Sequence, residues 1–146
     1  TLDFSEIFFY PRNAIVYRKG ESYPDLDSLK GKKIAYVFGT NYQQVAEGVE
    51  GAETVGIQGS PACIEEVKSK RADACIIDGA GASEFLKQND ELEMSLLDKT
   101  EDCFAIGFPK ESPYYETFNN TLKEMMENGE LDKIVAAHLS EQFILD

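Results

Sequence analysis

The clearest fold signal in the sequence is the stretch Lys33-Ile34-Ala35-Tyr36-Val37-Phe38-Gly39. It is continuously apolar after its lysine and ends in a glycine. A strand that is apolar on both faces is typical of a parallel sheet, because helices cover both sides of such a sheet. The stretch therefore predicts a buried strand over residues 33–38 in an α/β fold.

Strand and helix signals alternate on either side of this stretch. Further strands are predicted over residues 14–17, 53–57 and 74–77, and helical segments over residues 25–30, 42–48 and 79–89. Another helix is predicted after Ser60-Pro61, with the serine as N-cap and the proline at the first helical position. Because helical segments separate the strands, crossover connections are needed, and the sheet is predicted to be largely parallel.

The C-terminal part is predicted to be mainly helical. Strands are expected over residues 93–97 and 103–108, and the second stops at Pro109. Ser112-Pro113 is expected to cap a helix that Asn128-Gly129 ends. The apolar stripe of this helix is Phe118, Leu122, Met125 and Met126, and a final helix carries Leu131, Ile134, Val135, His138 and Leu139 on one face.

Length and charge exclude several classes of function. The 146 residues suit one domain, or one lobe with an appendage. With 27 acidic against 14 basic residues the net charge is −13, which disfavours binding to nucleic acid and to anionic membranes. The longest apolar runs are too short to cross a bilayer. No signal segment opens the chain, so an export signal is expected to have been removed or never to have been present.

The sequence offers little for catalysis or for metal binding. Its three cysteines, Cys63, Cys75 and Cys103, form no metal motif and are expected to be buried free thiols, so neither a metal nor a cofactor is expected. The one histidine, His138, has the spacing of a helix-face residue rather than that of a catalytic base. The segment Gly79-Ala80-Gly81-Ala82 lacks the dinucleotide fingerprint, and no catalytic residue is predicted.

Two strand ends carry candidate binding groups. In open parallel sheets, ligands sit outside the carboxyl ends of the strands. Gly39, Thr40 and Asn41 follow one strand and offer close backbone approach, side-chain hydrogen bonds and unpaired N–H groups for a carboxylate. An ordinary strand-to-helix turn with a threonine cap explains the same residues equally well.

Asp78 follows a second buried strand, where it can cap the next helix or hold an ammonium group. Taken alone, capping is the better explanation for Asp78. Beside an anion-binding turn, the two groups together suit a zwitterion, with its carboxylate on the turn and its ammonium on Asp78. Phe38 and Tyr42 are the expected walls of this pocket.

Several motifs, in order along the chain, resemble a known family. They are Phe4-Ser5 with Ala14 to Gly20, Asp27-Ser28-Leu29-Lys30-Gly31-Lys32-Lys33, the turn Gly39-Thr40, Arg71 to Asp78, Phe104 to Lys110, and Asn128-Gly129-Glu130-Leu131-Asp132-Lys133-Ile134. Together these motifs resemble the bacterial extracellular solute-binding proteins of family 3, the polar amino acid receptors of ABC importers. The resemblance implies the type II periplasmic-binding fold, a carboxylate on Gly39-Thr40 and an ammonium on Asp78.

The resemblance also implies a domain organisation. Residues 1–12 would be a hinge and first crossover, residues 13–101 an α/β ligand-binding lobe, and residues 102–146 a return strand with C-terminal helices. Family members have a further lobe that would precede Thr1, so ligand affinity is expected to be weak without it. The apolar stripe of the C-terminal helices is expected to fold back on the lobe or to pack on a second copy, as a homodimer or by domain swapping.

The expected function is that of the substrate-binding component of an amino acid ABC importer. Its partners would be a small amino acid ligand and the ABC permease, and its location would be periplasmic or extracellular, with or without a lipid anchor. One alternative keeps the fold as the sensory ligand-binding domain of a receptor or regulator. A less favoured alternative is a dehydratase-like enzyme, since the lobe offers only Asp78 and tyrosines as acid or base groups.

Overall fold

The computed structural model describes residues 1–144, apart from the side chain of Glu141. The chain divides into two compact units, Arg12–Asp98 and Thr1–Pro11 together with the chain from Lys99 onward. The first is called the sheet unit and the second the tail unit. Each is described by itself.

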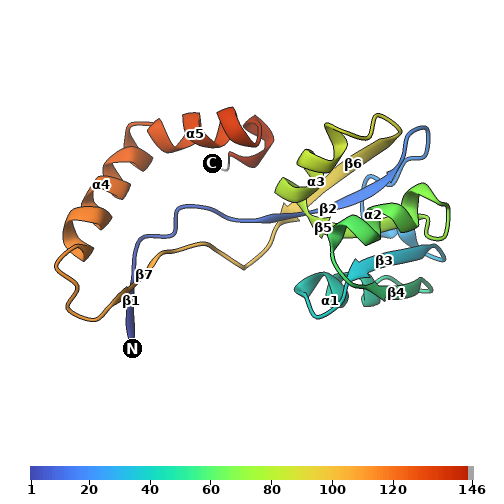
Figure 1. Ribbon diagram of the computed structural model, residues 1–146, viewed down its shortest axis with the longest axis horizontal. Helices are drawn as coiled ribbons and strands as arrows, with labels where there is room; N and C mark the ends of the chain where they lie inside the picture. Colours follow the sequence, from blue (N-terminus) through green and yellow to red (C-terminus); the bar gives the residue numbers. More distant parts are fainter. Residues whose placement is uncertain (145–146) are drawn as a thin grey trace. The chain divides into compact units, whose positions relative to one another are not determined.

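The sheet unit is built on a five-stranded sheet in the order β4-β3-β5-β2-β6 (Figure 1). Its strands are β2 (Arg12–Arg18), β3 (Lys33–Val37), β4 (Glu53–Ile57), β5 (Ala74–Asp78) and β6 (Leu92–Lys99). Strand β3 pairs in parallel with both β4 and β5, which confirms a buried strand in a parallel arrangement. Strand β2 instead pairs antiparallel with β5. It is followed by a single 3-10 turn, η1 (Asp27–Leu29), rather than by a crossover helix.

Apolar side chains cover both faces of this sheet, as the sequence predicts. Ala35 and Cys75 belong to one buried cluster, while their strand neighbours Ile34 and Ile76 belong to a second cluster. Successive residues of a strand point to opposite faces, so the two clusters lie on the two sides of the sheet. Helices α2 (Ser60–Lys68) and α3 (Gly79–Leu86) contribute to the first cluster, and α1 (Asn41–Glu47) contributes to the second.

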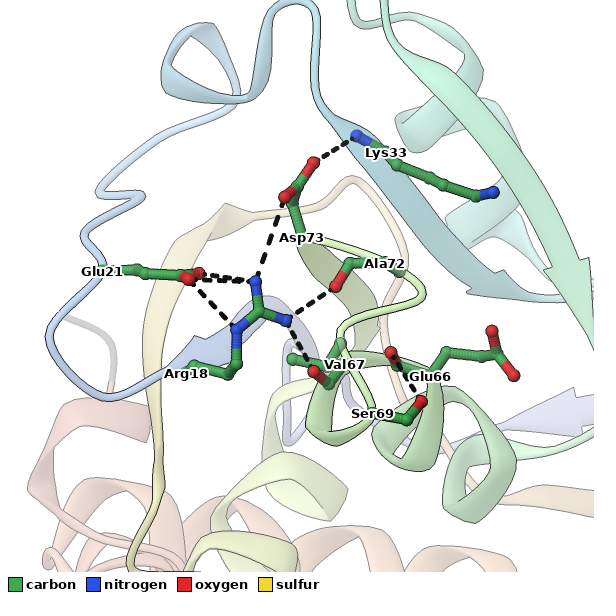
Figure 2. A network of polar contacts seen from close by, with 8 residues as sticks. All are labelled: Arg18, Glu21, Lys33, Glu66, Val67, Ser69, Ala72 and Asp73. Carbon is green, nitrogen blue, oxygen red and sulfur yellow. Dashed lines mark hydrogen bonds and ion pairs between the residues drawn. The ribbon is translucent and has the colours of Figure 1, made fainter.

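A polar network lies at the edge of the sheet where β3 and β5 begin (Figure 2). Arg18, the last residue of β2, donates hydrogen bonds to the carbonyl oxygens of Val67 at 2.6 Å and Ala72 at 2.8 Å. Its guanidinium also pairs with Glu21 at 2.9 Å. Asp73, just before β5, accepts a hydrogen bond from the backbone N–H of Lys33 at 2.8 Å. The network therefore links β2, α2, β3 and the loop that leads into β5.

The tail unit contains a short two-stranded ladder and helices. Strand β1 (Leu2–Phe4) pairs antiparallel with β7 (Gly107–Pro109). Helices α4 (Tyr115–Glu127) and α5 (Glu130–His138) follow, then the 3-10 turn η2 (Glu141–Phe143). The predicted strand over residues 103–108 was too long, because before Gly107 only an isolated bridge forms, between Phe104 and Phe9.

Both predicted serine caps were wrong, and the backbone hydrogen bonds show why. The N-cap of α2 is Gly59, with φ of +84°, because the first helical bond runs from the N–H of Cys63 to the carbonyl of Gly59. Ser112 and Pro113 lie in a turn before α4, whose helical bonds begin at the carbonyl of Tyr114. Helix α3 also ends at Leu86, since the N–H groups of Gln88 and Asn89 bond three residues back instead of four.

Candidate ligand-binding site

The carboxyl ends of β3 and β5 lie next to each other at one edge of the sheet. In the parallel register Ile34 pairs with Ala74 and Tyr36 with Ile76. The chain therefore leaves both strands at the same edge, where the Gly39-Thr40-Asn41 turn follows β3 and Asp78 ends β5. The structure thus brings the two groups that the sequence singled out to adjacent strand ends.

The backbone of the turn after β3 is accessible to a ligand at Gly39. Gly39 has φ of +78°, a conformation that side chains rarely adopt. Beyond Gly39 and its two chain neighbours, no heavy atom of the described chain lies within 4 Å of the position that a Cβ would occupy. Thr40 occupies the N-cap position of α1, yet its hydroxyl makes no capping bond. The hydroxyl instead donates to the carbonyl of Val37 at 2.6 Å. Because this bond uses the hydroxyl hydrogen, the Thr40 oxygen can only accept a further hydrogen bond in this conformation. To donate to a ligand carboxylate, the hydroxyl would have to rotate.

The residues that flank the turn differ in exposure. Asn41 opens α1 and is exposed, whereas Tyr42 is half-buried and packs against the cluster that contains Tyr36 and Ala46. Phe38 is 60% exposed, which is unusual for a large apolar side chain beside a well-packed sheet. Phe38 is thus the predicted wall residue with the most surface free for a ligand.

Asp78 caps helix α3. Its Oδ2 accepts a hydrogen bond from the backbone N–H of Gly81 at 2.7 Å, which confirms the capping role predicted for Asp78 taken alone. The two roles are compatible, because an ionised carboxylate has about four acceptor sites and this bond uses one. The side chain is only half-buried, so the remaining acceptor sites are within reach of a ligand.

A hydrogen bond between Tyr36 of β3 and Glu47 of α1 links this helix to the sheet behind the turn. The hydroxyl of Tyr36 donates to Oε1 of Glu47 at 3.3 Å, and the same oxygen accepts from Gln43 at 2.9 Å. Burial, followed by the negative charge of Glu47, raises the pKa of Tyr36. Tyr36 therefore stays a neutral donor at physiological pH and helps to hold the helix that carries Asn41 and Tyr42.

One polar residue at this edge was missed by the sequence analysis. Asn13 is 4% exposed and lies directly opposite Asp78 in the antiparallel pairing of β2 with β5. The predicted strand began one residue later, at Ala14. A polar residue before an apolar run reads as a strand boundary, so the sequence held no signal that Asn13 is buried.

The other residues considered for chemistry are His138 and the three cysteines. His138 ends α5 in the tail unit, on the helix where it was expected. The cysteines are free, with Cys63 and Cys75 buried and Cys103 exposed, so the expectation of burial was wrong for Cys103. Burial raises the pKa of Cys63 to about 11. Within residues 1–144, no group of three or more metal-ligating side chains converges, and no helix is long and apolar enough to span a bilayer.

Comparison with known proteins identifies relatives over most of the chain, although no family model matches it. The arginine-binding extracellular protein ArtP of Bacillus subtilis (strain 168) is 32% identical over 139 residues, which are 91% of this chain and 54% of that protein. An ancestral arginine-binding protein, solved with arginine bound, is 30% identical with a TM-score of 0.70 over 94% of this chain and 64% of that one. The homologues of this chain are amino-acid-binding proteins of bacterial ABC transporters.

Further homologues have names that refer to other amino acids. They include proteins named for binding histidine, glutamine and L-cystine. The L-cystine solute receptor of Neisseria gonorrhoeae, in its unliganded open conformation, shows the same fold at 20% identity, with a TM-score of 0.78 over 100% of this chain and 63% of that one. These neighbours confirm the predicted fold, a lobe of the type II periplasmic-binding class. The chain spans about half the length of the curated relatives that it matches.

Proposed function

We propose that the chain is the ligand-binding lobe of a substrate-binding protein of an amino acid ABC importer. The observation that carries the proposal is the shared strand edge, where the open Gly39 turn and the partly free carboxylate of Asp78 are adjacent. A zwitterionic amino acid suits this pair, with its carboxylate at Gly39, Thr40 and Asn41 and its ammonium at Asp78. Phe38 and Tyr42 would flank the ligand.

The proposal assigns no catalytic step to the chain. Its homologues are transport binding proteins, and the edge offers one carboxylate that already caps a helix rather than a general acid paired with a base. A sensory domain would use the same residues to bind the same ligand, so the test of the site is a binding test. The intact protein would work outside the membrane and deliver its ligand to an ABC permease.

Replacing Asp78 tests the ammonium site. Asparagine is also a good N-cap, so Asp78→Asn keeps α3 in place and removes only the negative charge. In an NMR titration with L-arginine, the wild-type chain should show saturable shifts at the amides of Gly39 to Tyr42 and Gly79 to Gly81. Loss of a charge-assisted hydrogen bond should weaken the affinity of Asp78→Asn by about tenfold or more.

Asp73→Asn is the matched control for this experiment. Asp73 lies at the opposite edge of the same sheet, in the Arg18 network, and its substitution also removes one carboxylate. Its affinity for L-arginine should equal that of the wild type. Equal affinity in Asp78→Asn and the wild type would refute the ammonium site, and the absence of saturable shifts with L-arginine, L-glutamine, L-histidine and L-cystine would refute the function.

We also propose that the tail unit binds a second copy of the chain. A hollow of about 220 Å³ is lined by Phe8, Phe9, Leu131, Ile134, Val135 and His138, and the side chain of Ile134 is 46% exposed. Apolar surface of this kind favours association in water. Sedimentation should show a concentration-dependent dimer that Ile134→Glu dissociates. A monomer at every concentration would refute this proposal and would leave the ligand site untouched.

A further inference from the structure

Asn13 is a buried polar residue whose side chain has no partner in the part of the chain that the structure describes. Besides Asn13, the buried polar residues of that part are Ser5 and Asn119. Ser5 donates to the carbonyl of Glu6 and accepts from the N–H of Ile106, and Asn119 accepts from the N–H of Glu6 at 2.7 Å. Across residues 1–144, by contrast, no hydrogen bond or ion pair involves the carboxamide of Asn13, although the side chain is more than nine-tenths buried. Native proteins rarely leave such a group unsatisfied.

Asn13 lies at the same sheet edge as Asp78. Asn13 and Asp78 are directly opposite in an antiparallel pair, and such residues place their side chains on the same face of the sheet. Within the described chain, the one fully enclosed side-chain oxygen or nitrogen without a partner is Thr100 Oγ1. The amide atoms of Asn13 therefore retain an opening to the outside. Asn13 itself lies at the end of β5, directly opposite Asp78.

An unpartnered amide at this position lowers the stability of the fold. Burial removes most of the amide from water, and no group within residues 1–144 replaces the lost hydrogen bonds. A leucine of similar size would fill the same space without that penalty. Groups of this kind persist at functional sites, where a ligand supplies the missing partner.

We propose that Asn13 is a ligand-binding residue whose carboxamide oxygen accepts a hydrogen bond from the ammonium group held by Asp78. This inference rests on the proposed amino acid site. Asn13 and Asp78 would together satisfy two N–H groups of one ammonium.

The test compares stability and binding in Asn13→Leu. Because leucine removes an unsatisfied group, the urea midpoint should stay the same or rise. The affinity for L-arginine, from the NMR titration, should fall about tenfold, as expected for one lost hydrogen bond to a charged group. Asn119→Leu is the matched control, since that amide is satisfied within the fold: its midpoint should fall and its affinity should not change.

Asn13→Asp is the second variant in this binding test. Aspartate keeps the acceptor oxygen, so its affinity should stay within about threefold of the wild type. A loss as large as that of Asn13→Leu would overturn the assignment to the ammonium. Unchanged affinity in Asn13→Leu, or a lowered midpoint or failure to fold, would overturn the ligand role altogether. Binding by the wild type in the same titration separates these outcomes from failure of the proposed function.

Discussion

At the scale of single residues, Arg18 illustrates how one side chain fixes several elements. Its planar guanidinium bonds two carbonyl oxygens and one carboxylate, and its side chain is 16% exposed. Lysine keeps the charge but cannot reproduce this fork. We expect Arg18→Lys to lower the free energy of unfolding by about 1–3 kcal/mol, because at least one buried carbonyl loses its donor.

Urea denaturation measures this loss, and Arg71→Lys is its control. Arg71 pairs with Glu66 at 2.8 Å, but its side chain is 61% exposed. An exposed pair contributes little, so its substitution should change stability by less than about 0.5 kcal/mol. Equal effects in the two variants would show that the carbonyl contacts of Arg18 do not stabilise the fold.

Residues of the site differ in how much the sequence revealed about them. Asp78 and Gly39 carry local signals, because each directly follows an apolar run that predicts a buried strand. Asn13 and Arg18 carry none, since their surroundings arise when β2 pairs with β5, about sixty residues further along the chain. Tertiary pairing of this kind is invisible to local periodicity, whereas strand ends are not.

At the scale of elements, the junction between α4 and α5 depends on Gly129. This glycine has φ of +79°, and the side chain of Asn128 accepts a hydrogen bond from the N–H of Glu130 at 2.9 Å. Alanine is strained in this left-handed conformation. We expect Gly129→Ala to destabilise the helix pair by about 1 kcal/mol.

Hydrogen exchange of the α4 and α5 amides measures the effect of Gly129→Ala. Gly129→Asn is the control, because asparagine tolerates the left-handed conformation better than alanine does. Its amides should exchange more slowly than those of Gly129→Ala. If the alanine variant exchanged like the wild type, the left-handed turn would not limit the stability of the pair.

The ends of an element were predicted correctly where one sequence signal marked them. They were predicted wrongly where more than one residue could begin the element. The strands β3, β4 and β5 were predicted within one residue of their ends. In β3 and β5 a charged residue precedes the apolar run, and a glycine or an aspartate follows it. Ser60-Pro61 and Ser112-Pro113 both suggest a helix start, yet the helices begin at different offsets from them. The offset depends on which carbonyl accepts the first helical bond, and residue type alone does not specify that carbonyl.

At the scale of the whole molecule, the two units differ in how many buried hydrophobic residues they contain. Of the buried hydrophobic residues described, all but Leu122 and Phe143 lie within residues 12–98. Since burial of apolar surface is the main stabilising contribution to folding, the sheet unit should unfold last. The tail unit instead carries exposed apolar side chains, including Phe4, Phe104 and Ile134.

Hydrogen exchange should therefore report two levels of protection in one chain. At low protein concentration, amides of α4 and α5 should exchange well before those of β2, β3 and β5, because few buried contacts oppose local opening of the tail unit. If a second copy covers the apolar hollow of the tail unit, α4 and α5 should become more protected as concentration rises, while the sheet amides stay unchanged. Uniform protection at every concentration would contradict this division of stability.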